Sequence, residues 1–520
     1  MLRIINLCAG LNDDITEIKN RLEKQLGSKV NSVKIIKRAI DARKKNDVHY
    51  VLSVDATVEK EEYILRKNLP NVSIAKTEKY VFPVAEPKGK RPLIVGTGPA
   101  GLFCALYLSR TGFNPIVIER GADIDSRTKS IESYWSSGEL DERTNVQFGE
   151  GGAGTFSDGK LNTGTKDIRI SAVLEEFVVH GAKEDILVNN KPHIGTDILR
   201  NVVKNIRTEI IKNGGEVRFL TKLTDIKLEN GRVVGAVVEN ADRKYEIETD
   251  KIVLAIGHSA RDTFEMLKMR GIKMEQKPFS IGARIEHTQA FISSAMYGDA
   301  AKSLPPADYK LAVHLSNGRS LYTFCMCPGG YVVASASEKN TIVTNGMSYS
   351  DRSGNNANSA ILVNVTPSDF ESNDPLAGVY LQREIESRAY TIGAGKAPAE
   401  TVGSFLGKTN TNAPRGAVIP TYKPQVTFTS LERVFPEFIT ASMRQGLILM
   451  DKRIHGFASD DAILTAPETR SSSPVRLLRN DNLELSAKGL FTAGEGGGHA
   501  GGITSSAVDG IKAAEAVLRL

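Results

Sequence analysis

Several features that mark particular classes of protein are scarce in this sequence. It contains no run of about 18 apolar residues, so no conventional transmembrane helix is expected. Its four cysteines are too few for a disulfide scaffold, and no group of cysteines and histidines has zinc-ligand spacing. The short apolar start of the chain is followed at once by Asp13 and Asp14, which argues against a signal peptide. We therefore expect a globular, cytoplasmic protein without a metal site.

Charge of one sign is not in large excess either, because the formal net charge is only +6. Basic residues are nevertheless concentrated between positions 34 and 45. A patch of this kind is compatible with binding to nucleic acid or to an anionic substrate. Aromatic residues do not alternate with its charges, as binding to single strands would require. We favour a solvated loop and strand edge, and do not expect nucleic acid as the partner. The patch consists of Lys34, Lys37, Arg38, Arg43, Lys44 and Lys45.

The first 82 residues are predicted to form a small unit of their own. Three stretches, "RIINL", "VNSVKII" and "VHYVLSVDATV", have the composition of strands. A helix between the first two is predicted to be capped by Asn12 or Asp13 and ended by Gly27. A second short helix and the strand "VSIA" complete a βαββαβ order, which is typical of the ferredoxin-like arrangement. Residues 83–91, rich in proline and glycine, are predicted to be a linker.

A glycine motif after the linker has the context of a dinucleotide site. The pattern GxGxxG begins at three positions, and only the one at Gly96 lies between a buried strand and a helix. Gly96 permits the tight turn, and Gly98 lets the backbone approach a diphosphate. Gly101 lets the helix pack closely on the strand. The other two matches begin at Gly149 and Gly496.

The residues around this motif fit the same site. Pro99 and Ala100 open the helix, whose N-terminus offers free N–H groups and a partial positive charge to phosphates. Glu119 ends the next strand, about 20 residues later, where a carboxylate accepts hydrogen bonds from ribose hydroxyls. Its negative charge would also repel a 2′-phosphate. We interpret the segment as a site for an adenine dinucleotide.

Two further glycine clusters favour FAD over NAD as that dinucleotide. One is "GEGGAGTFSDGKLNTG", and the other is "GEGGGHAGG", close to the C-terminus. A plain NAD-binding domain needs neither. A flavin is longer, and its ribityl chain and ring must be held by backbone that can approach closely. An apolar stripe at helical spacing follows Ile503, so the second cluster is expected to be ordered.

The chain resembles the glutathione-reductase-like FAD superfamily, in the branch that closes its flavin domain with the end of the chain. The matching residues are the strand "GLFTAG", an acid at Glu495 and a helix beginning near Gly502, Ile503 and Thr504. The superfamily usually has Asp where Glu495 stands. The stretch "KIVLAIG" resembles a second signature, with Ile256 in place of a threonine. This resemblance implies that the terminal helix points its positive end at N1 and O2 of the flavin.

A closer resemblance, over nearly the whole chain, is to a family of mostly uncharacterised bacterial FAD-dependent dehydrogenases. It is carried by "VQFGEGGAGTFSDGKLNT", "PHIGTD", "AIGHSARDT", "KPFSIGARIEH", "FCMCPGG", "ETRSSSPVR" and "AGEGGGHAGGITSSAVDG". We expect further cofactor contacts beside those already described. They are Arg120, Gly152, Gly154, Thr155, Lys160, Leu161, Leu223, Ala255, Gly257 and Gly494.

Candidates for the chemistry lie close to the glycine clusters. His499 lies inside the terminal loop, where it is a candidate proton shuttle, a flavin hydrogen-bond partner or an incidental loop residue. His258 is a weaker candidate that local packing or a helix cap would also explain. Arg470 is placed to clamp an anionic substrate or to anchor its loop by an ion pair. Cys325 and Cys327 are either a redox pair or two thiols that line a cavity.

These observations predict an α/β fold with a Rossmann-like FAD-binding domain, split between residues 92–277 and 440–520. Residues 278–439 are predicted to form an inserted mixed α+β substrate domain. The predicted function is that of an FAD-dependent oxidoreductase that moves a hydride between an organic small molecule and flavin N5. NADH or NADPH as a visiting donor, and a geranylgeranyl-reductase-like activity on an unsaturated lipid, stay open as alternatives. A flavoprotein associated with nucleic acid and a binding protein without turnover stay open too. The sequence leaves the oligomeric state undetermined.

Overall fold

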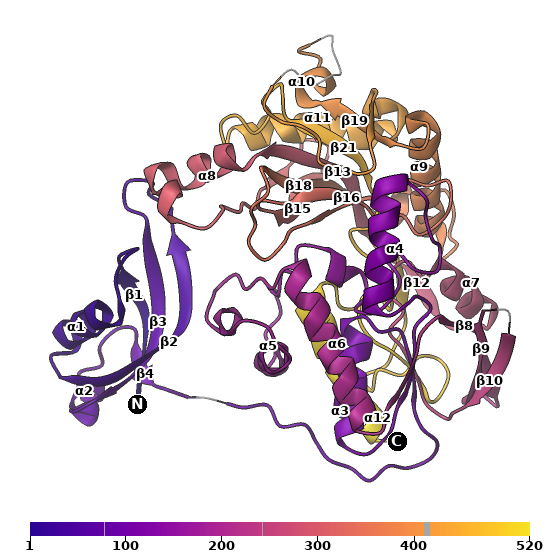
Figure 1. Ribbon diagram of the computed structural model, residues 1–520, viewed down its shortest axis with the longest axis horizontal. Coiled ribbons are helices and arrows are strands. Elements are labelled where there is room, and N and C mark those ends of the chain that lie inside the picture. Colours follow the sequence, from indigo (N-terminus) through magenta and orange to yellow (C-terminus); the bar gives the residue numbers. More distant parts are fainter. Residues whose placement is uncertain (77, 242, 410–415) are drawn as a thin grey trace.

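The computed structural model describes residues 1–76, 78–241, 243–409 and 416–520 and has three lobes (Figure 1). The N-terminal lobe contains a four-stranded antiparallel sheet in the order β2-β3-β1-β4, with two helices. The βαββαβ order predicted from the sequence is the one observed. Its elements are β1 (Leu2–Ala9), α1 (Ile15–Leu26), β2 (Val30–Asp41), β3 (His49–Val58), α2 (Glu61–Arg66) and β4 (Val72–Ile74).

Helix α1 shows how local sequence fixes the N-terminal lobe. Asp14 is its N-cap and forms a capping box with Glu17, whereas Asn12 or Asp13 was predicted to be the cap. Asp13 instead accepts a hydrogen bond from the backbone N–H of Gly10. Gly27 ends the helix in the left-handed conformation, as predicted. The helix buries its apolar face in the core beneath the sheet.

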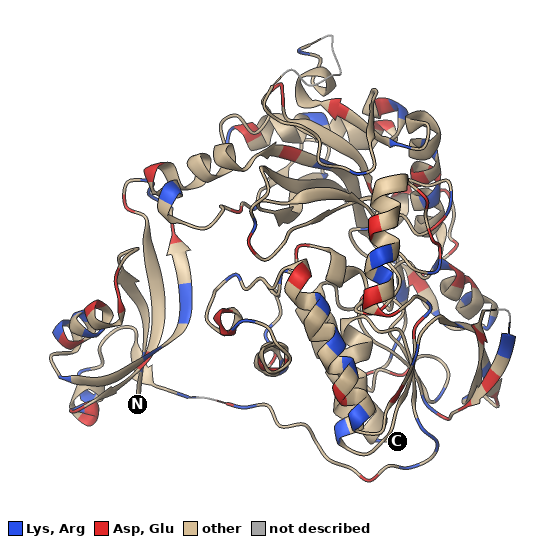
Figure 2. Cartoon of the chain, viewed as in Figure 1, with Lys and Arg blue, Asp and Glu red and all other residues tan. Residues whose placement is uncertain are grey.

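The N-terminal lobe contacts the rest of the molecule through the edge strand β2. The backbone N–H of Arg38 donates to Val188, and the N–H of Asn190 donates to the carbonyl of Arg38. The Arg38 guanidinium also donates to the Asn189 side chain. Part of the basic patch predicted from the sequence is therefore used for contact between lobes. Figure 2 shows charges of both signs on each lobe.

The second lobe is built on a parallel sheet of five strands in the order β23-β11-β5-β6-β7. Its central strand, β5, is the first strand of the lobe in the sequence, and the edge strand β23 comes from the C-terminal end of the chain. The strands are β5 (Leu93–Val95), β6 (Ile116–Ile118), β7 (Glu216–Arg218), β11 (Ile252–Leu254) and β23 (Leu490–Thr492). The helices are α3 (Pro99–Arg110), α4 (Ile124–Ser137), α5 (Arg169–Val179), α6 (Thr196–Lys212), α7 (Arg261–Met269) and α12 (Ile503–Leu518).

Alternate residues of this sheet face two different cores. Ile94, Val117 and Val253 are buried beneath α3, α6 and α12. Val95 and Ile118 face the other core, which a three-stranded antiparallel sheet shares. That sheet consists of β8 (Thr221–Glu229), β9 (Arg232–Asn240) and β10 (Arg243–Glu248). A short antiparallel pair, β12 (Met274–Gln276) and β22 (Val475–Leu477), lies where the chain leaves and re-enters this lobe.

The third lobe contains a seven-stranded mixed sheet in the order β14-β15-β18-β13-β21-β19-β20. Helix α11 packs on this sheet against β13, β14, β15 and β18. The strands are β13 (Phe279–Thr288), β14 (Ala312–His314), β15 (Ser320–Cys327), β18 (Asn356–Val365), β19 (Ala397–Thr401), β20 (Val426–Phe428) and β21 (Ile463–Glu468). A separate pair is β16 (Tyr331–Ala334) and β17 (Thr344–Met347), and the helices are α8 (Gln289–Tyr297), α9 (Ala377–Gly393), α10 (Val402–Phe405) and α11 (Glu437–Asp451).

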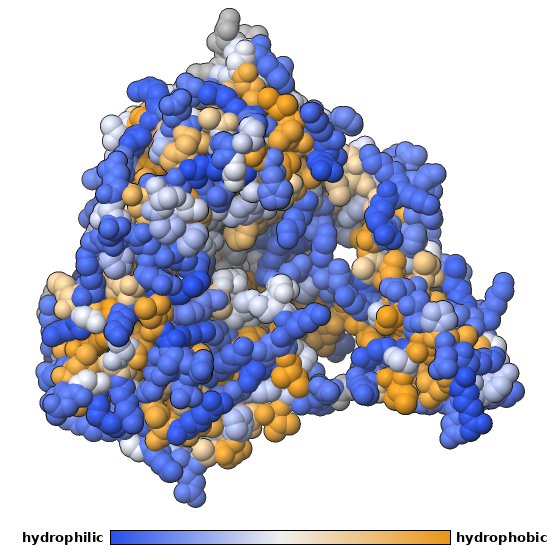
Figure 3. All heavy atoms as spheres, turned by 180° about the vertical axis from the view of Figure 1, so that it is seen from behind, coloured by the Kyte–Doolittle hydropathy of each residue, from blue (hydrophilic) through white to orange (hydrophobic). Residues whose placement is uncertain are grey.

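The boundary predicted at residue 440 is wrong, because β21 belongs to the third lobe. It pairs with β13 on one side and with β19 on the other. The chain therefore returns to the second lobe only after Glu468, at β22. This boundary was not predictable from the sequence, since an apolar strand such as β21 fits either sheet. Figure 3 shows a hollow in the surface between this lobe and the two others.

Candidate functional site

The two glycine segments that the sequence analysis assigned to one cofactor do come together. Strands β5 and β23 both pair with β11, which brings the loops after them to the same edge of the sheet. Helices α3 and α12 cross closely beside that edge, because a Cβ on Gly510 would lie 2.1 Å from the carbonyl oxygen of Ala100. About 400 residues of sequence thus separate two segments in direct contact.

Close backbone approach explains the glycines of the first motif. Gly96 has a φ of +105°, and a Cβ there would lie 2.4 Å from the carbonyl oxygen of Ala255. A Cβ on Gly101 would lie 1.9 Å from the carbonyl oxygen of Gly96. The predicted roles of these glycines in the turn and in helix packing are therefore observed. Any larger residue at Gly96 or Gly101 would separate α3 from the sheet.

The second glycine cluster lies against both helix N-termini. A Cβ on Gly152 would lie 2.9 Å from the Cα of Gly98, and one on Gly154 would lie 2.9 Å from the side chain of Ile503. Gly494, before α12, has only 2.9 Å between its Cβ position and the side chain of Ala100. Three glycine-containing loops from three parts of the chain therefore surround one point.

Both helix N-termini at this point lack a side-chain cap among the described residues. Gly98 is the N-cap of α3 and Gly502 that of α12. In the first turn of α12, the Thr504 hydroxyl donates to the carbonyl of Leu161 at 2.7 Å. The predicted residues Leu161 and Thr504 are thus in direct contact. Uncapped N–H groups and the positive ends of two helices favour a bound anion.

Glu119 does not have the role predicted for it in this structure. Its Oε2 accepts from the backbone N–H and the hydroxyl of Thr97 at 3.0 and 2.8 Å. Its Oε1 accepts from the N–H groups of Gly121 and Gly149, both at 3.0 Å. A carboxylate has about four acceptor positions, so none is left for ribose hydroxyls. Glu119 instead ties together three loops, and the sequence did not reveal it because Gly149 lies 30 residues away.

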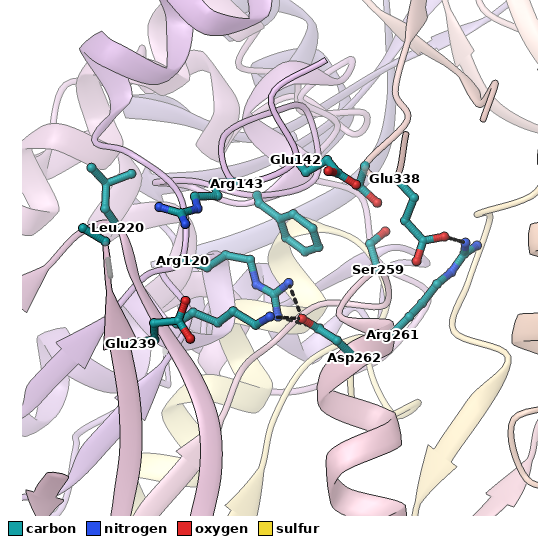
Figure 4. Close-up of a pocket in the computed structure, with 13 residues that line it drawn as sticks. Arg120, Glu142, Arg143, Leu220, Glu239, Ser259, Arg261, Asp262 and Glu338 are labelled. Atoms are coloured by element: carbon teal, nitrogen blue, oxygen red, sulfur yellow. Dashed lines mark hydrogen bonds and ion pairs between the residues drawn. The ribbon is translucent and has the colours of Figure 1, made fainter. Parts of the chain in front are cut away.

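Arg120, the next residue, lines a pocket of about 320 Å³ (Figure 4). Its guanidinium donates to Asp262 at 2.9 Å, and Lys222 contacts the same carboxylate at 2.5 Å. Burial acts to raise the pKa of Asp262, and the two cations outweigh it and hold that pKa below its usual value. Leu223 was predicted as a contact, but Lys222 of β8 and Leu220, just before that strand, line the pocket instead. Leu223 itself is buried.

The "AIGHS" stretch meets the terminal loop. A Cβ on Gly496 would lie 2.8 Å from the backbone nitrogen of Gly257. His258 Nδ1 lies 3.6 Å from Glu495 Oε2. His258 Nε2 is buried and has no hydrogen-bond partner in the part of the chain that is described. His258 and Glu495, which the sequence analysis assigned separately, therefore form a pair with one ring nitrogen free.

His499 is tied to the neighbouring strand. Its Nε2 lies 2.9 Å from the carbonyl oxygen of Leu477, so this nitrogen carries the hydrogen and donates it. Burial and the nearby Arg479 lower the pKa of His499. A neutral imidazole anchored to Leu477 still has Nδ1 as an acceptor. Its contacts explain its position in the loop without a proton-transfer role, and that role stays a prediction.

Arg470 is part of a buried ion-pair network. Its Nε and Nη2 donate to the two oxygens of Glu386 at 3.0 and 2.9 Å, and its Nη1 donates to Ser259 and Ser337. Arg261 donates to both oxygens of the same carboxylate through its Nη1 and Nη2. All three nitrogens of the Arg470 guanidinium have partners. Of the two predicted roles, the contacts support the loop anchor and argue against the substrate clamp.

The two candidate cysteines lie at a bulge in β15 and differ in environment. Cys327 is buried, whereas Cys325 is exposed and has a φ of +42°. Both thiols are free. This arrangement fits thiols beside a cavity better than a redox pair.

A polar cluster next to Cys325 was not predicted as a unit. We name it the Asp158 cluster, and it joins the second glycine stretch to the third lobe. Lys160 Nζ lies 3.5 Å from Asp158 Oδ2 and also donates to the carbonyl of Met326 in β15. The sequence signals were "SDGK" and "PHIGTD", which carried only the resemblance. The cluster consists of Asp158, Lys160, His193, Ser348 and Arg352.

Comparisons with known proteins agree with this geometry. A model described as pyridine nucleotide-disulphide oxidoreductase matches residues 90–296, and one described as FAD-dependent protein, C-terminal domain-like, matches residues 278–471. A domain of unknown function matches residues 1–57. An uncharacterized protein of Clostridium beijerinckii is 46% identical over 99% of this chain and 98% of its own length. The chain belongs to the same family as that protein, and this is an FAD-dependent oxidoreductase family.

The solved structures that this chain resembles have low sequence identity to it. The glycerol-3-phosphate dehydrogenase from Bacillus halodurans complexed with FAD is 13% identical, with a TM-score of 0.35 over 83% of this chain and 65% of that chain. A geranylgeranyl bacteriochlorophyll reductase-like protein from Thermoplasma acidophilum is 13% identical, with a TM-score of 0.37 over 84% and 79%. A flavin-dependent brominase mutant is 14% identical, with a TM-score of 0.37 over 82% and 80%. Scores this low carry no argument about substrate.

The residues present fit FAD as the cofactor of this family. The hydroxyl of Thr155 is buried within the second glycine cluster and has no hydrogen-bond partner among the described residues. Gly98 and Gly152 face each other, and a Cβ on either would fill the space between their backbones at the N-terminus of α3. Two uncapped helix ends, an unpartnered hydroxyl and bare backbone are what a diphosphate and a ribityl chain require.

In the described part of the chain, every helix is too short or too polar to span a membrane.

Proposed function

We propose that this oxidoreductase is a dehydrogenase of an organic small molecule bound between the second and third lobes. FAD, when bound, supplies a two-electron acceptor for hydride. The observation that supports this proposal is the meeting of α3, α12 and the second glycine cluster at one edge of the parallel sheet. The third lobe contacts that same cluster through Lys160 and Met326.

The chain's own residues have separate tasks in this proposal. The N-terminus of α3, with Gly98 as its N-cap, holds the diphosphate with free N–H groups. The N-terminus of α12, with Gly502 as its N-cap, would hold the part of the cofactor that becomes negatively charged when reduced. A helix end is worth up to ~2 kcal/mol to a partly buried charge. The pocket beside Arg120 holds the adenosine end, with Phe148 beneath the Arg120 guanidinium at 4.2 Å.

The assignment of lobes is part of the same proposal. We assign residues 1–82 to a ferredoxin-like domain, which the antiparallel β2-β3-β1-β4 order supports. Residues 83–91 link it to the flavin-binding domain, and the whole belongs to the glutathione-reductase-like superfamily. The third lobe binds the substrate.

Two measurements test the proposal: the absorbance of bound flavin and the loss of that absorbance on reduction. Purified protein is expected to be yellow and to release FAD on denaturation, at about one per chain. Anaerobic mixing with NADH, with NADPH and with a panel of organic acids, alcohols and saturated lipids is expected to bleach the flavin absorbance with one class of these hydride donors. Matched variants are Gly98→Val, which blocks the diphosphate position, and Gly164→Val, whose Cβ position has no heavy atom within 4 Å.

The outcomes separate the alternatives. A colourless protein that takes up no added FAD would contradict the proposal outright. If only NADH or NADPH bleaches the flavin, that nicotinamide is the electron donor. If a saturated lipid bleaches it, the reverse of a lipid reduction has occurred, which favours the reductase alternative. Retention on RNA at moderate salt would favour the nucleic-acid alternative. That outcome is not expected, since Arg38 contacts Asn189, and Arg43 contacts Asp41.

A further inference from the structure

The charged groups of the Asp158 cluster lie close together but are not joined as tightly as the partners of a structural ion pair. Asp158 is its centre, with 3% of its surface exposed. One of its oxygens lies 3.7 Å from His193 Nε2, and the other lies 3.6 Å from Arg352 Nη2. Ser348 donates a hydrogen bond to the first oxygen. The ion contacts are too long to be hydrogen bonds.

Three polar atoms of the cluster have no hydrogen-bond partner among the described residues. They are Asp158 Oδ2, His193 Nε2 and Arg352 Nε, and all three are buried. Leaving a buried polar group unpaired costs about 1–3 kcal/mol, and more for a charged group. Most buried polar groups in proteins are paired for this reason. Arg352 Nε is a donor that a carboxylate oxygen would satisfy, whereas Asp158 Oδ2 accepts only and needs an O–H or N–H group of the same ligand.

The charge of the cluster determines which ligand fits. Lys160 and Arg352 carry two positive charges, and Asp158 carries one negative charge. Burial lowers the pKa of His193 to about 4, so the imidazole is neutral at pH 7. The neighbouring Arg284 is paired with Glu468 at 2.9 Å and adds no net charge. The cluster therefore holds one uncompensated positive charge, which a carboxylate balances and a phosphate of about −1.5 to −2 would exceed.

The cluster adjoins the first turn of α12, where the proposed function puts the flavin ring. Lys160 precedes Leu161, whose carbonyl accepts a hydrogen bond from Thr504 in the first turn of α12. On its other side Lys160 donates to Met326, next to the exposed thiol of Cys325. Gly329 lets the loop approach, because a Cβ there would lie 1.7 Å from the carbonyl oxygen of Arg352. The cluster is thus shared by the flavin-binding and substrate-binding lobes.

We propose that the Asp158 cluster binds the carboxylate group of the substrate, so that this oxidoreductase acts on an organic acid. The inference rests on the proposed function, since it names the substrate class of the same site. Arg352 and Lys160 attract the carboxylate. Asp158 holds these two cations apart and in place, and His193 offers a neutral nitrogen to a hydroxyl or amine of the same substrate.

Binding of a simple carboxylate to the purified holoprotein tests the inference without turnover. The probe is succinate, with succinamide as the uncharged analogue and inorganic phosphate as the second anion, all at constant ionic strength. Calorimetry and the change in flavin absorbance report binding. We expect succinate to bind at least tenfold more tightly than either comparison ligand. Arg352→Gln is expected to weaken succinate binding at least tenfold, and Arg352→Lys to restore part of it. Arg388→Gln, on the exposed face of α9, is the matched control and is expected to bind as the wild type does.

A second measurement needs no variant. Succinate is expected to slow the modification of Cys325 by methyl methanethiosulfonate at least tenfold, as mapped by mass spectrometry. The exposed Cys8 in the N-terminal lobe is the internal control, and its rate is expected to stay unchanged. Equal binding of succinate and succinamide, or unchanged Cys325 modification, in a protein that holds FAD would overturn this inference alone. Absence of FAD would instead contradict the proposed function, and calorimetry on that protein would still test the cluster.

Discussion

Glu386 shows how a single residue connects distant parts of this molecule. It lies on α9 in the third lobe, with none of its side chain exposed, and binds Arg261 from the second lobe and Arg470 from the segment after β21. Burial acts to raise its pKa, and the two guanidiniums outweigh it and lower that pKa to about 2. A buried carboxylate between two cations leaves both unpaired when it is removed.

Glu386→Gln is therefore expected to destabilise the protein by about 3–5 kcal/mol, the usual cost of breaking a buried ion pair. Glu384→Gln is the matched control, since Glu384 lies on the same helix, is exposed and pairs with Arg388. Its loss is expected to cost at most about 0.5 kcal/mol. Urea unfolding of the two variants measures both. Equal midpoints for the two variants would contradict the importance of the network.

The same residue predicts a pH dependence. The unfolded pKa of a glutamate is about 4.3, and the folded pKa of Glu386 is about 2. A depressed pKa gives stability that is present above the unfolded value and is lost as the pH falls toward the folded value. The difference in urea midpoint between wild type and Glu386→Gln is expected to be constant from pH 7 to 5 and to shrink from pH 4.5 downward. A difference that grows over that range would show the sign to be wrong.

Residue roles that depend on local backbone were predictable, and roles that depend on distant partners were not. Gly96 and Gly101 follow from the turn and the packing of one helix on one strand, which a short stretch of sequence specifies. Glu119 was assigned to a ribose, and Arg470 was left open between a substrate clamp and a loop anchor, because their protein partners, Gly149 and Glu386, lie far away in the sequence. The Asp158 cluster was missed as a unit for the same reason, although Lys160 was expected to contact the cofactor.

At the scale of elements, the crossing of α3 and α12 positions both glycine segments. Gly510 lies where the two helices touch, and its burial follows from that contact. The apolar spacing after Ile503 predicted α12, but nothing in the sequence showed that α3 is its neighbour. The βαββαβ order of the N-terminal lobe was predicted more completely, because each of its elements has its own local signals. Strand β21 was misassigned, since its register partners are not local.

Gly510→Ala tests the helix crossing. Its new Cβ would lie 2.1 Å from the Ala100 carbonyl, which is backbone and has little freedom to move away. Overpacking of this kind costs about 1–3 kcal/mol, and displacement of α3 is expected to weaken FAD retention as well. Gly164→Ala is the control, because nothing lies within 4 Å of its Cβ position. The unfolding midpoint and the ratio of flavin to protein absorbance measure the two effects. If the ratio of flavin to protein absorbance is unchanged in Gly510→Ala, the crossing of α3 and α12 does not affect cofactor binding.

At the scale of the whole molecule, the N-terminal lobe is held by backbone hydrogen bonds at β2 and by the segment just before its linker. Tyr80 donates to Glu515 of α12 at 2.6 Å, and Phe82 packs on Tyr107 of α3. The end of the N-terminal unit therefore lies against the helices that carry both glycine segments. Movement of the N-terminal lobe would therefore displace α3 and α12 through these contacts.

Asn190→Pro removes the N–H that donates to Arg38, whereas Asn190→Ala keeps it. Loss of one such bond is worth about 0.5–1.5 kcal/mol, so the Arg38 amide is expected to exchange roughly two- to tenfold faster in the proline variant. Hydrogen exchange measured by mass spectrometry over β2 reports this change. Equal exchange in the two variants would mean that the lobe is held elsewhere.

The central claim is that segments near residue 100 and at the C-terminus bind one FAD molecule between them. An experimental structure of the holoprotein tests this most directly. We expect the diphosphate at the N-terminus of α3, beside Gly98, and the flavin ring at the N-terminus of α12, beside Gly502. A flavin bound elsewhere, with either helix end in contact only with protein or solvent, would contradict it.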